Sequence, residues 1–314
     1  MLLSQWFMYN AFGNMKRSFQ RGFDSYDPLL TTVDKAIERT RSLRAHVDFT
    51  QTMRSFFRNP PQEIKQEKHL KNGVRTLIST PPIPNDRVVL YVHGGAFVLG
   101  LMNIQMDFAA QLSKASHAIV WSVDYRLAPE YPFPAGLEDV FAVYKSMLSE
   151  GVNPNKITLV GESAGGNLLL GLLLKIKQEK VPLPGAAIPI SALTDFNMTG
   201  ESYETREHLD PMLPVDRKKT LHFSYLRGES PDNPLASPLL GDLAGLPPLF
   251  IMVGGREILH SDSINFAEKA NKAGVDVTLD VDEKMFHAYP LFYNTFDEAK
   301  LAIGKMSLFI QMKT

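Results

Sequence analysis

Ser163 lies in the stretch LVGESAGGN, with Gly161 two positions before it and Gly165 two positions after it. A serine hydroxyl can act as a nucleophile when a tight turn presents it and a neighbouring base takes its proton. Glycines on both sides suit such a turn, because a side chain at either position would collide with the crossing backbone. The GxSxG pattern is common by chance, so the surrounding sequence must distinguish a nucleophile from an ordinary bend.

A second glycine motif, HGGAF, begins at His93 and follows the apolar run VVLYV. Backbone N–H groups in such a loop can bind the oxyanion that forms when a serine attacks a carbonyl group. The amide that follows the serine, at Ala164, would be a further donor. Taken alone, the motif favours a simple glycine turn after a strand.

A serine nucleophile needs a histidine base, and in serine hydrolases of the strand–serine–helix type this histidine comes last in the chain. Four histidines follow Ser163, namely His208, His222, His260 and His287. We predict that His287 is the base, because EKMFHAYPLF comes just after the last strand-like run. His208 and His222 fall in a polar insertion, and His260 would compete with the acid for its place.

The carboxylate that orients the histidine should lie after the strand-like run LFIMV, in the sequence GGREILHSD. This sequence offers Glu257 and Asp262. Glu257 is nearer to the end of the strand, so we predict that it is the acid. Asp262 stands where the N-cap of a helix is expected, which explains it structurally, but it remains a rival.

Strand-like and helical segments alternate from about residue 73 onward. The predicted strands are 74–78, 88–92, 118–123, 157–160, 186–190, 249–253 and 277–281, and the predicted helices are 104–116, 137–150, 164–180, 263–273 and a last one from 298. Such alternation predicts a mostly parallel sheet with helices on both faces. The serine then stands between a buried strand and an apolar helix, as a nucleophile turn requires.

Two regions depart from this alternation. The first 55 residues have the spacing of amphipathic helices, and residues 196–230 are polar and contain prolines. We predict that 1–55 and 196–230 form a cap over a catalytic core made of 56–195 and 231–314. The first region contains the aromatic residues Trp6, Phe7, Phe12 and Phe19. Three roles are open to them: lining the pocket, packing the cap onto the core, and contact with a membrane surface.

Composition narrows the class of protein further. The chain has 314 residues, a net charge of −1 and no cysteine. A chain of about 300 residues can bury about 75% of the surface that it exposes when unfolded, which suits one large α/β domain with an insertion, or two domains. The absence of cysteine excludes disulfides and thiol chemistry, and the near-neutral charge argues against a nucleic-acid surface. We expect a cytoplasmic protein without a metal, a cofactor or a stable membrane anchor.

Five motifs together carry a resemblance to a known family. They are HGGAF, DYRLAPEYPFPA, GESAGGN, NPLASPLL and FHAY, in this order. This set resembles the hormone-sensitive-lipase family of α/β-hydrolases, and bacterial carboxylesterases in particular, over roughly residues 70 to 314. The resemblance implies an eight-stranded, mostly parallel α/β-hydrolase sheet with a helical cap. It also implies hydrolysis of short- to medium-chain acyl esters through an acyl-enzyme, without a cofactor.

The resemblance also assigns roles to individual residues. It implies a catalytic triad of Ser163, Glu257 and His287. It implies an oxyanion hole formed by the glycine motif and the residue after the serine, namely Gly94, Gly95, Ala96 and Ala164. In that hole Gly94 would shape the loop and the other three would donate their amides.

Four further positions bear on the family pattern. Asp124 and Arg126 belong to a motif expected to brace the nucleophile turn and the floor of the site. Ala96 replaces the usual third glycine, and Glu162 stands where aspartate is commoner. The acid is also a glutamate in a position that usually holds aspartate, which keeps the rival acid open.

Other activities fit the same motifs. Amide hydrolysis or deacetylation, and a dehydratase-type elimination, would use the same site. A non-catalytic ligand receptor on this fold is disfavoured because His287 is present. The expected partner is a small-molecule ester, and a homodimer is possible because dimers are frequent among similar esterases.

Overall fold

The structure is a computed structural model, and it describes positions 38, 40, 41 and 44 together with 60–213 and 221–314. Trp6, Phe7, Phe12 and Phe19 lie outside the described residues, as does most of the predicted N-terminal part of the cap. The division into cap and core therefore stays a prediction.

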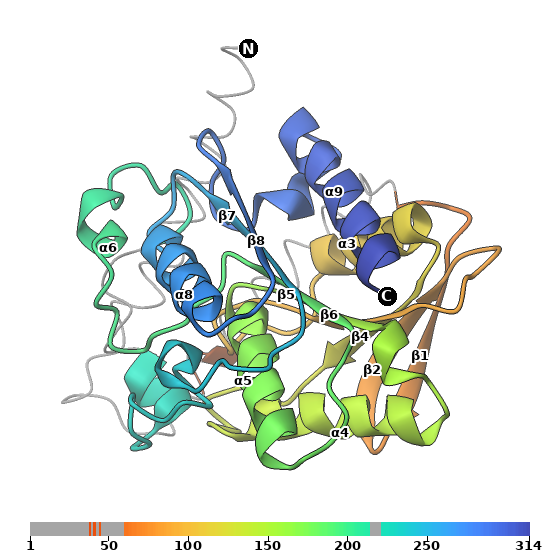
Figure 1. The fold of residues 1–314 in the computed structure, drawn as a ribbon, viewed down its shortest axis with the longest axis horizontal. Helices are drawn as coiled ribbons and strands as arrows, with labels where there is room; N and C mark the ends of the chain where they lie inside the picture. Colours follow the sequence, from red (N-terminus) through yellow and green to blue (C-terminus); the bar gives the residue numbers. More distant parts are fainter. Residues whose placement is uncertain (1–37, 39, 42–43, 45–59, 214–220) are drawn as a thin grey trace.

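One eight-stranded sheet forms the centre of the molecule, in the order β1-β2-β4-β3-β5-β6-β7-β8 (Figure 1). The strands are β1 (Lys65–Lys71), β2 (Val74–Thr80), β3 (Val88–Val92), β4 (Ile119–Asp124), β5 (Ile157–Glu162), β6 (Ala186–Ile190), β7 (Leu249–Gly254) and β8 (Val277–Asp282). Strand β2 is antiparallel to β1 and β4, and all other neighbours are parallel. The prediction of a mostly parallel eight-stranded sheet is confirmed.

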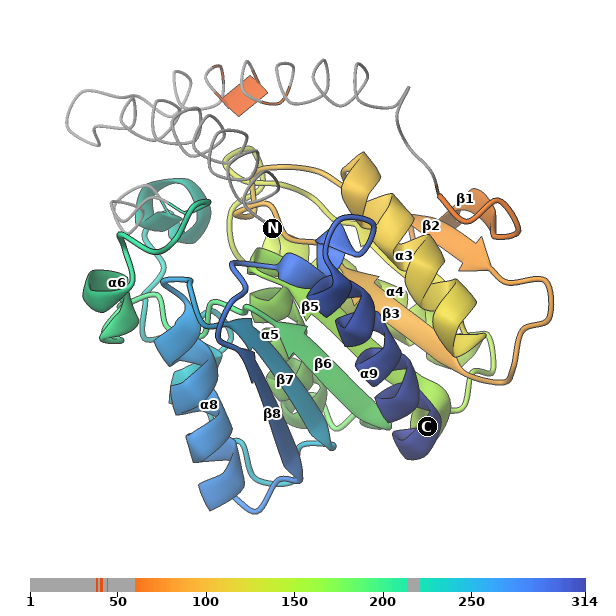
Figure 2. The same cartoon turned by 90° about the horizontal axis from the view of Figure 1, so that it is seen from above.

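Strand β1 is the one that the apolar pattern missed. Its sequence KQEKHLK contains four charged residues, and its apolar residue, Leu70, is 70% exposed. It pairs only with β2 and forms one edge of the sheet, seen beside β2 in Figure 2. An edge strand without a buried face has no apolar alternation to detect.

Helices cover both faces of the sheet. The long helices are α3 (Asn103–Ser116), α4 (Ala135–Ser149), α5 (Ala164–Gln178), α8 (His260–Lys272) and α9 (Asp297–Lys313), and the short ones are α6 (Ser202–Thr205), η1 (Pro154–Lys156), η2 (His222–Leu226), η3 (Pro238–Leu240) and η4 (Tyr289–Phe292). Helices α3 and α9 lie together on one face (Figure 2), and α4, α5 and α8 pack into the core of the other. Within the described residues, none of these helices has both the length and the hydropathy needed to cross a bilayer.

The start of α8 differs from the prediction. The helix begins at His260, three residues earlier than expected, with Leu259 as its N-cap. Asp262 therefore lies within the first turn and is not the cap. The helix ends at Lys272, one residue before the predicted end, and Gly274 follows the C-cap with φ +81° in the left-handed region.

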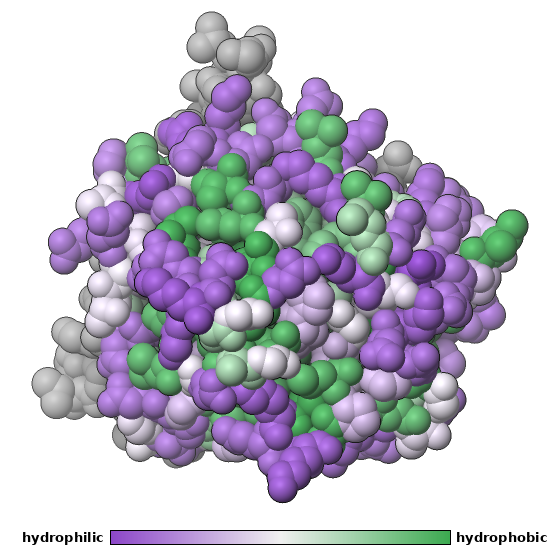
Figure 3. All heavy atoms as spheres, viewed as in Figure 1, coloured by the Kyte–Doolittle hydropathy of each residue, from purple (hydrophilic) through white to green (hydrophobic). Residues whose placement is uncertain are grey.

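The central strands supply side chains to two apolar cores. In β3, Leu90 and Val92 join the core under α5, whereas Val89 and Tyr91 join the core under α3. This alternation is the two-residue period of a strand that is buried on both faces. Polar residues nevertheless cover much of the molecular surface, with apolar patches between them (Figure 3).

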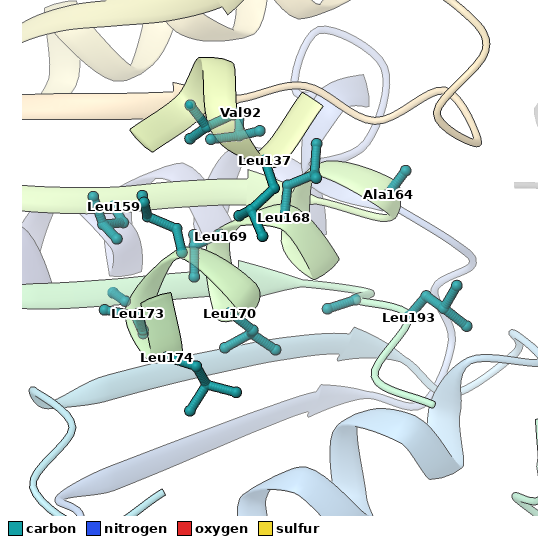
Figure 4. Packing of buried hydrophobic residues seen from close by; sticks show 14 of the residues in the cluster. Val92, Leu137, Leu159, Ala164, Leu168, Leu169, Leu170, Leu173, Leu174 and Leu193 are labelled. Carbon is teal, nitrogen blue, oxygen red and sulfur yellow. The ribbon is translucent and has the colours of Figure 1, made fainter. Parts of the chain in front are cut away.

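Helix α5 is buried along most of its length. The leucines at positions 168, 169, 170, 172, 173 and 174 are all at most 4% exposed. In Figure 4, Leu168 and Leu169 lie near Val92 and Leu159 of the adjoining strands. Replacing one such leucine with alanine typically costs about 2–5 kcal/mol, so α5 is firmly held. Ser163 directly precedes this helix and shares its rigid placement.

Candidate active site

The serine turn, residues 161–165, connects β5 to α5. Ser163 is its central residue and has φ 57° and ψ −120°. A positive φ is strained for a residue with a side chain, and such strain is frequent at functional sites. The Ser163 N–H donates to the carbonyl oxygen of Ile190 at 2.9 Å, which holds the turn against β6. The residue is half-buried and therefore within reach of solvent.

The two flanking glycines allow close backbone contacts. A Cβ atom at Gly161 would lie 2.6 Å from the carbonyl oxygen of Gly165. A Cβ atom at Gly165 would lie 2.5 Å from the carbonyl oxygen of His93. Both distances are too short for carbon and oxygen, so only glycine fits either position without displacing backbone.

The glycine loop, residues 93–97, follows β3 and lies next to the serine turn. Gly95, Ala96 and Phe97 have φ values of +118°, +53° and +64°. The N–H groups of Val98 and Leu99 both donate to the carbonyl oxygen of Gly95, at 3.0 and 2.9 Å. These bonds close the loop into a tight turn.

Three backbone amides at this place remain available. The described residues supply no acceptor for the N–H groups of Gly95, Ala96 and Ala164. Gly95 and Ala96 are half-buried, whereas Ala164 is buried at the start of α5. The Gly94 N–H is already used, because it donates to Glu162 Oε1 at 2.6 Å. The Gly94 N–H is therefore not available as a donor to an oxyanion, whereas the other three amides could bind one.

His287 and Glu257 come together at the carboxyl ends of β8 and β7. The distance between His287 Nδ1 and Glu257 Oε2 is 2.6 Å. The side chains are 4% and 0% exposed, so water hardly competes for this hydrogen bond. An ionised carboxylate only accepts hydrogen bonds, so in the neutral imidazole Nδ1 carries the proton and Nε2 keeps a lone pair.

The other oxygen of Glu257 has partners that the sequence did not reveal. Oε1 accepts from the hydroxyl of Ser191 at 2.6 Å and from the N–H of Gly254 at 2.8 Å. The Ser191 hydroxyl in turn accepts from the N–H of Ala288 at 3.0 Å. Ser191 therefore links the end of β6 to both Glu257 and the residue after His287. The sequence signal that could have indicated this role is the position of Ser191 directly after the buried strand β6.

Asp262 lies elsewhere in the same region. Its Oδ1 accepts from the N–H groups of Thr194 and Asp195, at 2.7 and 3.2 Å, and from the Thr194 hydroxyl at 3.2 Å. Burial raises the pKa of this carboxyl group to about 6, against the lowering effect of these hydrogen bonds. Asp262 holds the loop after β6, and its described partners do not include His287.

The three alternative histidines have other surroundings. His222 Nε2 lies 2.9 Å from the carbonyl oxygen of Phe196. His260 is half-buried in the first turn of α8, where burial lowers its pKa. His208 is exposed after α6. None of these positions pairs a histidine with a carboxylate near the serine turn among the described contacts.

Asp124 and Arg126 each form an ion pair with a residue of another element. Arg126 binds Asp139 of α4 through Nε and Nη2, at 2.9 and 2.7 Å. Asp124 pairs with Arg75 of β2 at 2.9 Å. The contacts described for these two side chains are ion pairs with β2 and α4, and their role in bracing the nucleophile turn stays a prediction.

Tyr125, between these two residues, contacts the glycine loop through His93. Its hydroxyl donates to the carbonyl oxygen of His93 at 2.9 Å, and its ring stacks on the His93 ring with centroids 4.3 Å apart. Burial lowers the pKa of His93 to about 4, so this histidine is neutral and acts as a packing element. Tyr125 thus supports the glycine loop at its first residue, His93.

The inserted part of the predicted cap touches the glycine loop, and the N-terminal part touches the residue after it. Arg44 donates to the carbonyl oxygens of Val98 and Ala128, at 2.7 and 2.6 Å. Tyr225, from the inserted region, stacks on Phe97 with ring centroids 3.7 Å apart. The described parts of 1–55 and 196–230 therefore lie against the rim of the candidate site.

No metal centre is evident in this region. Among the residues that the structure describes, no three His, Asp or Glu side chains converge in a group that could hold a metal ion. The arrangement of a half-buried serine, a histidine–carboxylate pair and unpaired amides instead suits nucleophilic acyl transfer.

Comparisons with known proteins agree with this chemistry. The sequence profile of a family described as the alpha/beta hydrolase fold matches residues 89–291. An acetyl-hydrolase of Streptomyces hygroscopicus is 37% identical over 234 residues, which cover 74% of this chain and 78% of that protein. An esterase of Acinetobacter venetianus is 34% identical and covers 82% of this chain and 85% of its own length. The crystal structure of an esterase from the bacterial hormone-sensitive lipase family has a TM-score of 0.82 and 33% identity, covering 98% of both chains.

Proposed function

The chain belongs to the α/β-hydrolase family, with bacterial esterases of the hormone-sensitive-lipase type among its structural neighbours, and on this premise we propose that it is a serine carboxylesterase. The observation that carries the proposal is the strained turn that presents Ser163 between β5 and α5, next to unpaired amides of the glycine loop. The name esterase of one relative supports ester substrates, and the name acetyl-hydrolase of another supports a short acyl group; we extend the proposal to medium acyl chains.

In the proposed mechanism, His287 is the general base. Its Nδ1–H donates to Glu257, so Nε2 is free to take the proton of the Ser163 hydroxyl as its oxygen attacks the ester carbonyl. The carboxylate of Glu257 stabilises the imidazolium that forms. Ser191 and the Gly254 N–H hold this carboxylate in place, which keeps the imidazole ring in one orientation.

The developing oxyanion would be bound by the amides of Gly95, Ala96 and Ala164. One such donor is worth about 3 kcal/mol in the transition state of comparable enzymes. Ala164 contributes additionally as the first residue of α5, because the N-terminal end of a helix favours negative charge. The alcohol then leaves with a proton from His287, and water hydrolyses the acyl-enzyme by the same route.

The test is hydrolysis of p-nitrophenyl esters from acetate to palmitate by the wild type and by Ser163→Ala. We expect the wild type to be most active on short or medium chains and the variant to lose at least about 10³-fold in kcat. A second readout is mass spectrometry after treatment with phenylmethanesulfonyl fluoride, which should label the wild type at Ser163 and leave the variant unlabelled.

Ser149→Ala is the matched control, because this serine lies at the end of α4 and its hydroxyl only donates to the Ser146 carbonyl oxygen. It should keep full activity. Equal rates for Ser163→Ala and the wild type would refute the serine mechanism, and activity on amides but not esters would replace the substrate class. The homodimer and the cytoplasmic location stay predictions.

A further inference from the structure

Glu162, the residue before Ser163, has no part in the mechanism above. Its side chain is buried beneath the glycine loop, where Oε1 accepts from the Gly94 N–H at 2.6 Å and from Gln105 Nε2 at 2.7 Å. Gln105 lies in the first turn of α3, and its Oε1 accepts from the Met102 N–H at 2.8 Å. One carboxyl group therefore joins the end of β5, the glycine loop and the start of α3.

We propose that Glu162 is a positioning residue for the oxyanion hole. It holds the glycine loop at a constant distance from Ser163, and the charge of its carboxyl group changes how well the site stabilises an oxyanion. This inference rests on the esterase function proposed above. It concerns the residue at which this chain departs from the commoner aspartate, a departure for which the sequence alone offered no function.

The contacts at Gly94 support the positioning role. A Cβ atom there would lie 2.9 Å from the backbone oxygen of Glu162, 3.0 Å from its Oε1 and 3.1 Å from Ser163 Cβ. The glycine loop and the serine turn are thus in direct contact at this point. Because the Gly94 N–H is tied to Glu162, the next two amides, those of Gly95 and Ala96, have a defined direction.

The surroundings of Glu162 support the role of its charge. Burial raises the pKa of Glu162 to about 7, although the hydrogen bond from Gly94 opposes this shift. Tyr91 faces Glu162 from β3 and Tyr125 from the end of β4, and burial followed by the charge of Glu162 holds the pKa of both hydroxyls well above the ordinary value.

Two other titratable groups belong to this cluster. Burial lowers the pKa of His93 to about 4, so its ring is neutral over the working range. Burial has the largest effect on the pKa of both His93 and Tyr125, and the charge of Asp124 acts to raise both values. Asp124 forms an ion pair with Arg75 of β2. Among the described groups of this cluster, Glu162 is the one expected to titrate near neutral pH.

The positioning bonds survive protonation, but the charge does not. A neutral carboxyl group still accepts from the Gly94 N–H with Oε1 and can donate toward the Tyr91 hydroxyl with Oε2. The ionised group places a negative charge near a site where a second negative charge develops. Like charges repel more strongly in a buried site than in water, so ionisation of Glu162 should slow the reaction.

The experiment compares kcat and KM for p-nitrophenyl butyrate from pH 5.5 to 9 in the wild type, Glu162→Gln and Glu162→Leu. Glutamine keeps the acceptor for Gly94 and removes the charge. The ratio of kcat in Glu162→Gln to kcat in the wild type should rise about three- to tenfold through one ionisation near pH 7, at unchanged KM. Expressing the result as a ratio removes the pH dependence that the two proteins share.

Glu162→Leu removes both the charge and the acceptor, so the Gly94 N–H is left without a partner. The kcat of Glu162→Leu should be lower than that of the wild type at every pH. Glu162→Gln should not show this loss, because glutamine keeps the acceptor for the Gly94 N–H. Glu268→Gln, an exposed glutamate of α8, is the control for loss of a charge and should give a flat ratio. A flat or falling ratio for Glu162→Gln would overturn the proposal, even if the leucine variant does not fold.

A second readout does not depend on activity. Because the folded pKa of Glu162 lies above its ordinary value of 4.5, its contribution to stability is complete below pH 4.5 and is lost as pH rises through about 7. The urea midpoint of Glu162→Gln should therefore increase relative to the wild type between pH 5 and 8. If the midpoints shift so but the wild type hydrolyses no ester, the esterase function and the oxyanion role fail together. If the wild type is active but neither the kcat ratio nor the difference in urea midpoint changes with pH, the inference alone fails.

Discussion

The two acidic side chains that follow β7 have different partners. Glu257 binds the imidazole of His287, whereas Asp262 binds backbone amides of the loop after β6. A carboxylate that orients a catalytic histidine must face Nδ1, and among the described residues Glu257 has this position. Although glutamate is one methylene longer than aspartate, the hydrogen bonds from Ser191 and Gly254 to Oε1 hold its carboxylate in this position.

We predict that Glu257→Gln lowers kcat about 10³- to 10⁴-fold, because an amide facing Nδ1 favours the wrong tautomer of His287. Asp262→Asn should keep kcat within about threefold, because its Oδ1 can still accept from the Thr194 N–H. Steady-state kinetics with p-nitrophenyl butyrate at pH 8 would distinguish the two, with circular dichroism to check the fold. A larger loss in Asp262→Asn would reverse the assignment of the acid.

The loop that carries Glu257 is held by the inserted region. Ser202, at the start of α6, donates through its hydroxyl to the carbonyl oxygen of Ile258 at 2.6 Å and accepts from the Ser261 N–H at 2.9 Å. Asp210 Oδ2 accepts from the Ile258 N–H at 3.0 Å. The inserted region thus supports the acid of the proposed triad as well as standing at the rim of the site.

Ser202→Ala should therefore weaken this support. It removes the hydroxyl donor to Ile258 and the acceptor for the buried Ser261 N–H, at a cost of about 1–3 kcal/mol in the free energy of unfolding. We expect a severalfold lower kcat with little change in KM, because Glu257 is held less firmly. Urea denaturation and steady-state kinetics would measure both effects.

Thr205→Ala is the control within the same helix, since the exposed Thr205 hydroxyl only donates to the carbonyl oxygen of Glu201. Its stability and kcat should match those of the wild type. If Ser202→Ala behaves like this control, the inserted region does not support the loop that carries Glu257.

Across the whole molecule, Arg44 connects the N-terminal region to the core. Besides its bonds to the carbonyl oxygens of Val98 and Ala128, its Nη1 donates to Glu130 at 2.8 Å. The Arg44 side chain is 21% exposed, whereas that of Arg41, which lies 3.7 Å from the same carboxylate, is 71% exposed. A partly buried, multiply bonded arginine contributes more than an exposed ion pair.

Arg44→Gln should therefore speed chymotryptic cleavage within residues 1–59 several-fold, since the N-terminal region loses its bonds to the core. Arg41→Gln should leave the cleavage rate nearly unchanged. Gel electrophoresis of timed digests, with mass spectrometry of the fragments, would measure both rates. Equal acceleration in the two variants would show that Arg44 is not the principal link.

Local patterns in the chain were sufficient to locate the serine turn, the glycine loop, His287 and seven of the eight strands. Buried strands and helices have apolar periods of two and nearly four residues, and the glycines mark places where backbones come too close for a side chain. Parallel strands end at the same edge of a sheet, so residues after β3, β5, β7 and β8 could be expected to meet.

The hydrogen-bond partners could not be read from these patterns. Three features depend on residues that are distant in the chain. They are the hydrogen bond from Ser191 to Glu257, the hydrogen bond from Tyr125 to the glycine loop, and the pairing of His287 with Glu257 instead of Asp262. Sequence patterns report the conformation and burial of a segment, but a hydrogen bond requires its two atoms to meet within a few tenths of an ångström. That precision arises only when the helices and the sheet pack together, and the packing assigns each buried polar group its partner.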